Sequence, residues 1–138
     1  MTVLSKLKYI IASVCLCLMV ACNVPAKKQQ QSVIDHTEIT FEKMLHPFGK
    51  IKMGETVGCY FNFTNSGTFP LVINRVKPGC GCTSIKFPKE PILPGKKGEI
   101  EVRFDSKGFS GHQYKVIQVH ANIKSKIKEL VISANVIN

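Results

Sequence analysis

Cys80 and Cys82, separated only by Gly81, form the group whose residue types and spacing best suit chemistry. Two thiolates so close together can converge on one soft metal ion, such as copper(I) or zinc, because these metals favour sulfur ligands. The same pair can cycle between a dithiol and a disulfide, although so small a ring is strained and easily reduced. Alternatively, both cysteines pack a tight loop, with Gly79 and Gly81 in unusual backbone angles. The sequence leaves these three alternatives open.

A complete zinc site needs ligands beyond this pair. The sequence has no C-x-x-C pair and no H-x-x-x-H motif to supply them, so Cys59, His112 or His120 would have to approach through the fold. Lys77 lies close enough in sequence to lower a thiolate pKa, which would favour either chemical alternative.

The sequence contains no recognisable motif for acid–base or nucleophilic catalysis. The nine carboxylates include no evident acid and base pair, and no G-x-S-x-G motif marks a nucleophilic serine. His120 falls on the polar side of its segment, so we expect it to be exposed. The histidines show no ligand spacing; they are His36, His46, His112 and His120. We therefore expect no enzymatic activity.

The N-terminal segment has the layout of a secretory signal. Lys6 and Lys8 precede an apolar stretch over residues 9–20, which is too short for a comfortable membrane span. The stretch ends in Leu-Met-Val-Ala before Cys22, and this ending resembles the lipobox of bacterial lipoproteins. In such proteins the cysteine receives a diacylglycerol group and becomes the mature N-terminus. The alternative is an ordinary signal peptide cut after Ala21.

Three segments follow from this interpretation: a signal peptide over 1–21, the lipidated Cys22 with a flexible linker over 22–36, and a folded domain over 37–138. The linker has almost nothing to bury, so it is expected to act as a tether. Two or three acyl chains hold a protein at a membrane far more firmly than one. We expect a lipid-anchored protein of the cell envelope. The lack of an acidic run after Cys22 favours a periplasm-facing location.

Processing changes the charge and the cysteine count. The 138-residue chain has 19 basic and 9 acidic residues, a net charge of +10. Removing residues 1–21 takes away two lysines and two cysteines, which leaves about +8 and four cysteines. With Cys22 committed to lipid, three thiols remain, so a complete disulfide framework within the chain is excluded. The lysines cluster only at 124–128, without the aromatic residues of a nucleic-acid platform, and we expect no nucleic-acid partner.

The domain shows the period-two pattern of half-buried strands. In the segment 98–105, for example, Ile100, Val102 and Phe104 alternate with charged residues. No window shows a sustained helical period, and prolines and glycines recur too often for long helices. Seven short strands in about a hundred residues predict an all-β immunoglobulin-like sandwich. The expected strands span 38–42, 57–64, 71–76, 83–87, 98–105, 117–123 and 130–136.

An ordered set of short motifs resembles one bacterial family. The motifs are Phe48-Gly49-Lys50-Ile51, Phe63-Thr64-Asn65-Ser66-Gly67, Cys80-Gly81-Cys82-Thr83 and Pro94-Gly95. Together they resemble the domain of unknown function 1573, which is often found in envelope lipoproteins and is marked by its Cys-Gly-Cys-Thr motif. The resemblance covers about residues 38–137. It implies an immunoglobulin-like sandwich and no established activity.

Cys59 lies where an antibody domain keeps its first bridging cysteine, but the sixth expected strand offers no partner for it. We expect Cys59 to be a buried free thiol. The function expected from the whole sequence is a non-enzymatic, lipid-anchored binding or scaffolding module whose partner is an envelope protein or a glycan. The competing expectation is a protein that handles copper or zinc, or performs thiol redox chemistry, with Cys80 and Cys82.

Overall fold

Residues 36–138, which the computed structural model describes, form eight strands and no helix. The first four strands are β1 (Ile39–Phe41), β2 (Leu45–Lys52), β3 (Thr56–Asn65) and β4 (Ile73–Pro78). The others are β5 (Thr83–Lys86), β6 (Lys97–Asp105), β7 (Gly111–Ala121) and β8 (Ile127–Ile137). The described part of the chain contains no helix long and apolar enough to span a bilayer. The signal-peptide and Cys22 predictions concern residues outside the described range.

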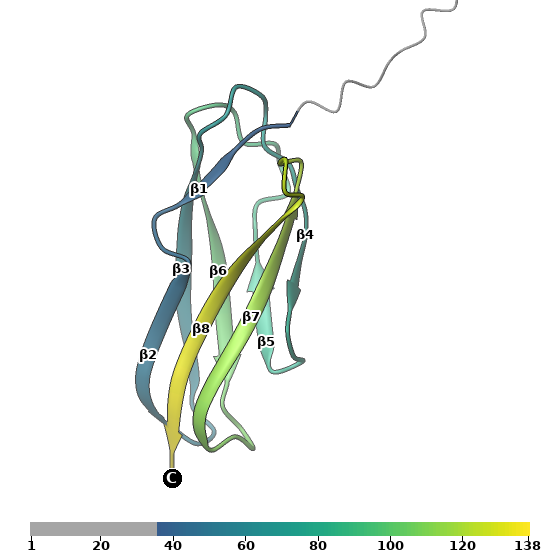
Figure 1. Ribbon diagram of the computed structural model, residues 1–138. Helices are drawn as coiled ribbons and strands as arrows, with labels where there is room; N and C mark the ends of the chain where they lie inside the picture. The colour runs from purple at the N-terminus through teal and green to yellow at the C-terminus, as the bar shows by residue number, and fades with distance from the viewer. Residues whose placement is uncertain (1–35) are drawn as a thin grey trace, which may run out of the picture. The chain divides into compact units, whose positions relative to one another are not determined.

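The strands form two four-stranded sheets that pack face to face, as the sequence predicts (Figure 1). One sheet has the order β1-β3-β6-β5 and the other β2-β8-β7-β4. All neighbouring strands are antiparallel except β2 and β8, which run parallel. The edge strands β4 and β5 lie side by side at the right of Figure 1, and each belongs to a different sheet.

The core lies between the sheets because one side chain in two points inward from each long strand. The bulky residues at its centre are at most 1% exposed. They are Phe61, Phe63, Ile100, Val102 and Phe104 from the first sheet, and Ile117, Val119, Leu130 and Ile132 from the second.

The sequence predicts about seven strands, and the described residues form eight; the additional strand is β2. Only Ile51 of this edge strand is buried, so β2 lacks the apolar alternation that marks the other long strands. A bulge between Pro47 and Lys50 also shifts its register against β8. Gly49 lies in this bulge with φ +74°, a backbone angle that a side chain would strain.

The start of the domain is fastened to both sheets. β1 pairs with β3, and the chain then crosses to the other sheet, where β2 pairs with β8. Just before β1, Thr37 forms a bridge with Ile123 at the end of the β7–β8 hairpin. The Thr37 backbone amide donates to the Asn122 carbonyl at 3.0 Å.

Asn65, at the end of β3, is fully buried, and its side chain contacts three other segments of the chain. Its Oδ1 accepts from the Thr37 hydroxyl at 2.8 Å and from the Gly67 amide at 3.1 Å. Its Nδ2 donates to the carbonyls of Phe69 and Ile92, each at 2.8 Å. All four hydrogen-bonding positions of the amide are therefore filled, which is what burial of such a group requires.

Asn65→Ala should lower the free energy of unfolding by about 3 kcal/mol or more, because it leaves buried donors and acceptors without partners. Asn62→Ala is the matched control, since Asn62 lies on the same strand with an exposed side chain, and it should change stability by less than about 0.5 kcal/mol. Urea unfolding of both variants measures the difference. Equal stability of the two would show that the Asn65 contacts are not needed.

Candidate functional site

Cys80 and Cys82 are joined by a disulfide bond in the short loop between β4 and β5. Both residues are half-buried, and Gly81 between them is exposed. The Cα atoms of the two cysteines lie 5.3 Å apart. The sequence left the bonding of this pair open, and in the structure the two sulfur atoms are bonded.

Backbone contacts hold this loop on both sides. The Asp105 amide of β6 donates to the Cys82 carbonyl at 2.9 Å. Gly79 lies so close to β7 that a Cβ there would come within 2.8 Å of the Val116 carbonyl oxygen. Neither Gly79 nor Gly81 has a positive φ, so the expectation of unusual backbone angles was wrong. Gly79 is needed instead for its close approach to a neighbouring strand.

The hydroxyl of Thr83 lies beside both sulfur atoms. Its Oγ1 is 3.5 Å from Sγ of Cys80 and 3.9 Å from Sγ of Cys82. Thr83 is buried, with 6% of its surface exposed, because it begins β5 opposite Phe104. The sequence contained Thr83 as part of a motif but gave no sign that its hydroxyl would contact the disulfide.

The described residues bring no further metal ligands to this pair. Between residues 36 and 138 no three histidine, cysteine, aspartate or glutamate side chains group in a way that could hold a metal ion. His112 is exposed at the start of β7. His120, which we expected to be exposed, is half-buried, and its buried Nε2 has no hydrogen-bond partner in this part of the chain.

Cys59 is a buried free thiol, as the sequence predicts. Burial raises its pKa from 9.0 to about 11, and the charge of Lys43 opposes this shift. A thiol with so high a pKa is almost entirely protonated at neutral pH, so it is a poor nucleophile and a poor metal ligand. Cys59 is part of the core and not of a reactive site.

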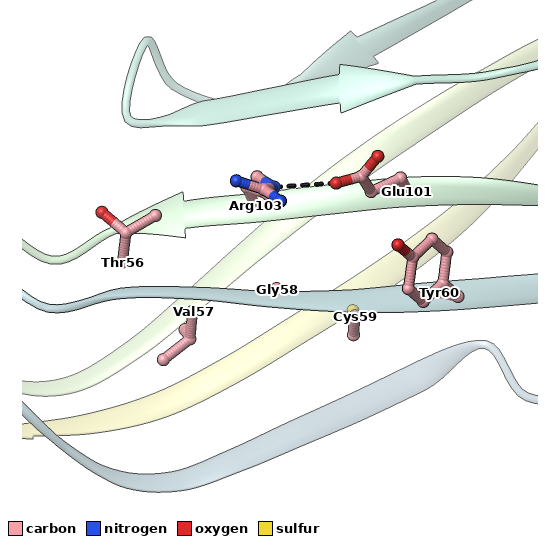
Figure 2. Close-up of a pocket in the computed structure, with 7 residues that line it drawn as sticks. All are labelled: Thr56, Val57, Gly58, Cys59, Tyr60, Glu101 and Arg103. Atoms are coloured by element: carbon pink, nitrogen blue, oxygen red, sulfur yellow. Dashed lines mark hydrogen bonds and ion pairs between the residues drawn. The ribbon is translucent and has the colours of Figure 1, made fainter.

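A hollow on the outer face of the first sheet also carries charged groups (Figure 2). Gly58 forms its floor, and Val57 and Cys59 point away from Tyr60, Glu101 and Arg103. Arg103 Nε donates to Glu101 Oε1 at 2.7 Å, and this hydrogen bond is the main reason why the pKa of Glu101 is lowered. Glu101 therefore stays ionised and is not suited to act as a general acid.

The outer face of the second sheet is more apolar than the strands expected from the sequence would make it. Leu45, Val131 and Val116 lie opposite one another across β2, β8 and β7, and Tyr114 follows along β7. We call these four residues the apolar face. Tyr114 is 71% exposed, Leu45 50% and Val116 41%. The signal was present in the sequence, because Tyr114 and Val116 alternate with polar residues, but strand 117–123 was expected to begin after them.

The strands of the two sheets also differ in charge. β2, β4, β7 and β8 together carry six basic residues and one acidic residue, Glu129. β1, β3, β5 and β6 carry three of each. The sheet that bears the apolar face is therefore strongly basic, and the opposite sheet is balanced.

The raised pKa of Cys59 predicts how stability depends on pH. In the unfolded chain this thiol ionises near pH 9.0, and in the folded domain near 11, so the unfolded state loses its proton first. The free energy of unfolding should therefore fall between pH 9 and 11, by at most about 1.4 kcal/mol per pH unit from this thiol. Cys59→Ala should remove that part of the slope. Parallel denaturant unfolding curves for both proteins across this range would contradict the assignment.

Several solved structures have a similar fold. A protein of unknown function from Porphyromonas gingivalis W83 matches with a TM-score of 0.65 and 17% identity, over 82% of this chain and 51% of that one. The chain thus spans about half the length of that protein. The ASH/PapD-like domain 7 of human CEP192 matches with a TM-score of 0.57 and 13% identity, over 75% of this chain and 87% of that one. At these identities the likeness shows the fold alone.

The Vibrio cholerae VesB protease contains a similar region, with a TM-score of 0.55, 13% identity and coverage of 75% of this chain and 32% of that one. No curated protein matches the chain. The family model described as "Protein of unknown function (DUF1573)" matches residues 39–136, which is most of the chain and all of the sandwich except its margins. The chain belongs to the DUF1573 family.

Proposed function

We propose that this protein is a non-enzymatic, lipid-anchored binding module of the bacterial cell envelope, and that it binds a partner protein through the apolar face. The observation that carries the proposal is the exposure of Leu45, Tyr114 and Val116 on the sheet with six basic residues and one acidic residue. Exposed apolar groups within a polar rim are typical of protein interaction sites.

The charge of this sheet indicates the chemistry of the partner. Lys50 and Lys52 border the apolar face on β2, and Arg75 and Lys77 lie on the opposite edge strand β4. A partner with an apolar patch flanked by carboxylates would complement this surface. Aliphatic side chains such as Leu45 and Val116 suit a protein surface better than a glycan.

The candidate catalytic groups support a non-enzymatic role. Glu101 accepts a hydrogen bond from Arg103, and Cys59 is buried with a raised pKa. Neither has the poised protonation state that acid–base or nucleophilic catalysis needs.

The envelope location is proposed from the lipobox-like sequence ahead of Cys22, with the periplasm as the compartment that the domain faces. A lipid anchor would hold the domain close to its partner, which raises the effective concentration of the binding surface.

Cys22→Ala should prevent acylation and release the protein from membranes. Fractionation of cells into membrane and soluble parts, followed by immunoblotting, measures the change. The wild-type protein should be found almost entirely with the membranes, and the variant almost entirely in the soluble fraction. Retention of the variant on membranes would refute the anchor.

Replacing Tyr114 and Val116 together by serine should weaken capture of the partner more than tenfold, because central apolar anchors carry most of the binding energy of an interface. Tyr60→Ser is the matched control, since Tyr60 is 51% exposed on the other sheet. The measurement is chemical crosslinking of the full chain in its own membranes, followed by purification and mass spectrometry. Retained capture in the double variant, equal loss in the control, or capture of a glycan alone would overturn the proposal.

A second candidate function, thiol redox chemistry at Cys80 and Cys82, is favoured by the disulfide between them. Metal binding by the same pair has less support. It would require the two cysteines to be reduced, and it would require further metal ligands nearby, which residues 36–138 do not supply.

A further inference from the structure

We propose that the Thr83 hydroxyl is the positioning group of a redox-active disulfide: it stabilises the thiolate that is released when the Cys80–Cys82 bond opens. This inference rests on the second candidate function and assigns a residue to it. Thr83 would act through the sulfur atoms and would not itself react.

The contacts fix the direction of the hydrogen bond. Sulfur atoms in a disulfide carry no hydrogen, so Thr83 Oγ1 must be the donor at 3.5 Å to Cys80 and 3.9 Å to Cys82. Within the described part of the chain, this buried hydroxyl makes its hydrogen bonds with these two sulfur atoms. No other group among residues 36–138 is recorded as a hydrogen-bond partner of this hydroxyl, which is held against the disulfide.

This hydrogen bond is weak in one redox state and strong in the other. Neutral sulfur is a poor acceptor, whereas hydrogen bonds to an ionised acceptor are roughly twice as strong as neutral ones. The hydroxyl therefore favours the reduced, ionised pair over the disulfide. Its effect is to lower the pKa of the thiol it contacts and to make the disulfide easier to reduce.

The loop is open to an incoming thiol. A Cβ placed on Gly81 would meet no atom within 4 Å, so the outer side of the loop is not covered by the described residues. Cys82 packs against the core cluster and its carbonyl accepts a hydrogen bond from the Asp105 amide, which holds the loop in place, while both cysteines keep part of their surface exposed.

The reaction is an exchange with the dithiol of a partner protein. One partner thiolate attacks Sγ of Cys82; a bond forms between these two sulfurs, and the Cys80–Cys82 bond breaks with its electron pair on Sγ of Cys80. This leaving sulfur is the one nearer the Thr83 hydroxyl. The second partner thiolate then attacks the partner's sulfur in the mixed disulfide and releases Cys82. The partner dithiol is oxidised, the pair is reduced by two electrons, and the two partner protons pass to the released cysteines or to solvent.

The test is a redox titration of the purified full chain in glutathione buffers, with mass spectrometry of the peptide that contains Cys80 and Cys82. Thr83→Val keeps the shape of the side chain and removes the hydroxyl. It should lower the equilibrium constant for reduction about tenfold, or about 30 mV for this two-electron couple. It should also raise the lower thiol pKa of the reduced pair by about one unit, measured from the pH profile of alkylation.

Thr83→Ser is the control, because it keeps the hydroxyl; it should keep both the potential and the pH profile of the wild type. If the wild-type pair cannot be reduced reversibly in the folded protein, the redox function itself fails. If the pair does exchange but Thr83→Val matches the wild type, or both variants shift alike, the role of Thr83 fails and the redox function stands. Partner capture through Tyr114 and Val116 is a separate measurement in either case.

Discussion

The buried amide of Asn65 is the contact on which the rest of the domain depends. A sandwich core supplies burial but little direction, because the hydrophobic effect is non-directional, whereas hydrogen bonds are directional. Asn65 fixes the end of β3 against three other segments, through the Thr37 hydroxyl and the carbonyls of Phe69 and Ile92. Because every donor and acceptor of the amide is used, one arrangement of these segments is preferred over its neighbours. The connections that lead into β4 and β6 are held in place at this end.

Ser106 plays a similar part near the start of β3. Its hydroxyl lies 2.8 Å from the carbonyls of both Lys52 and Glu55, and its amide donates to Glu55. The two polar side chains thus fasten both ends of β3 to neighbouring segments. The edge strands β4 and β5 contact each other at one side of the sandwich, and the disulfide loop joins them. The redox proposal needs this rigidity, because the Thr83 hydroxyl can act on the sulfurs only if β5 begins in a fixed position.

Much of this architecture could be predicted from the sequence, and the exceptions have physical causes. β3, β6 and β8 bury alternate apolar side chains, and the sequence shows that period directly. β2 does not, because an edge strand with one buried residue has no such pattern. The cysteine pair was evident from its spacing, whereas the Thr83 contact and the apolar face depend on which residues the register places opposite one another. The pairing register of the strands cannot be predicted from a single sequence.

The first two strands of the domain pair with different sheets, and this has a mechanical consequence. Any tension that reaches the domain from its N-terminal side enters at Thr37 and passes into β1, where it pulls on the pairing with β3. Beyond the crossing, the parallel pairing of β2 with β8 carries the load into the second sheet. Before the N-terminal side of the domain could be pulled free, two separate pairings would have to break, one in each sheet. In the lipid-anchored form proposed above, the domain would be held from this side, and both pairings would oppose its unfolding.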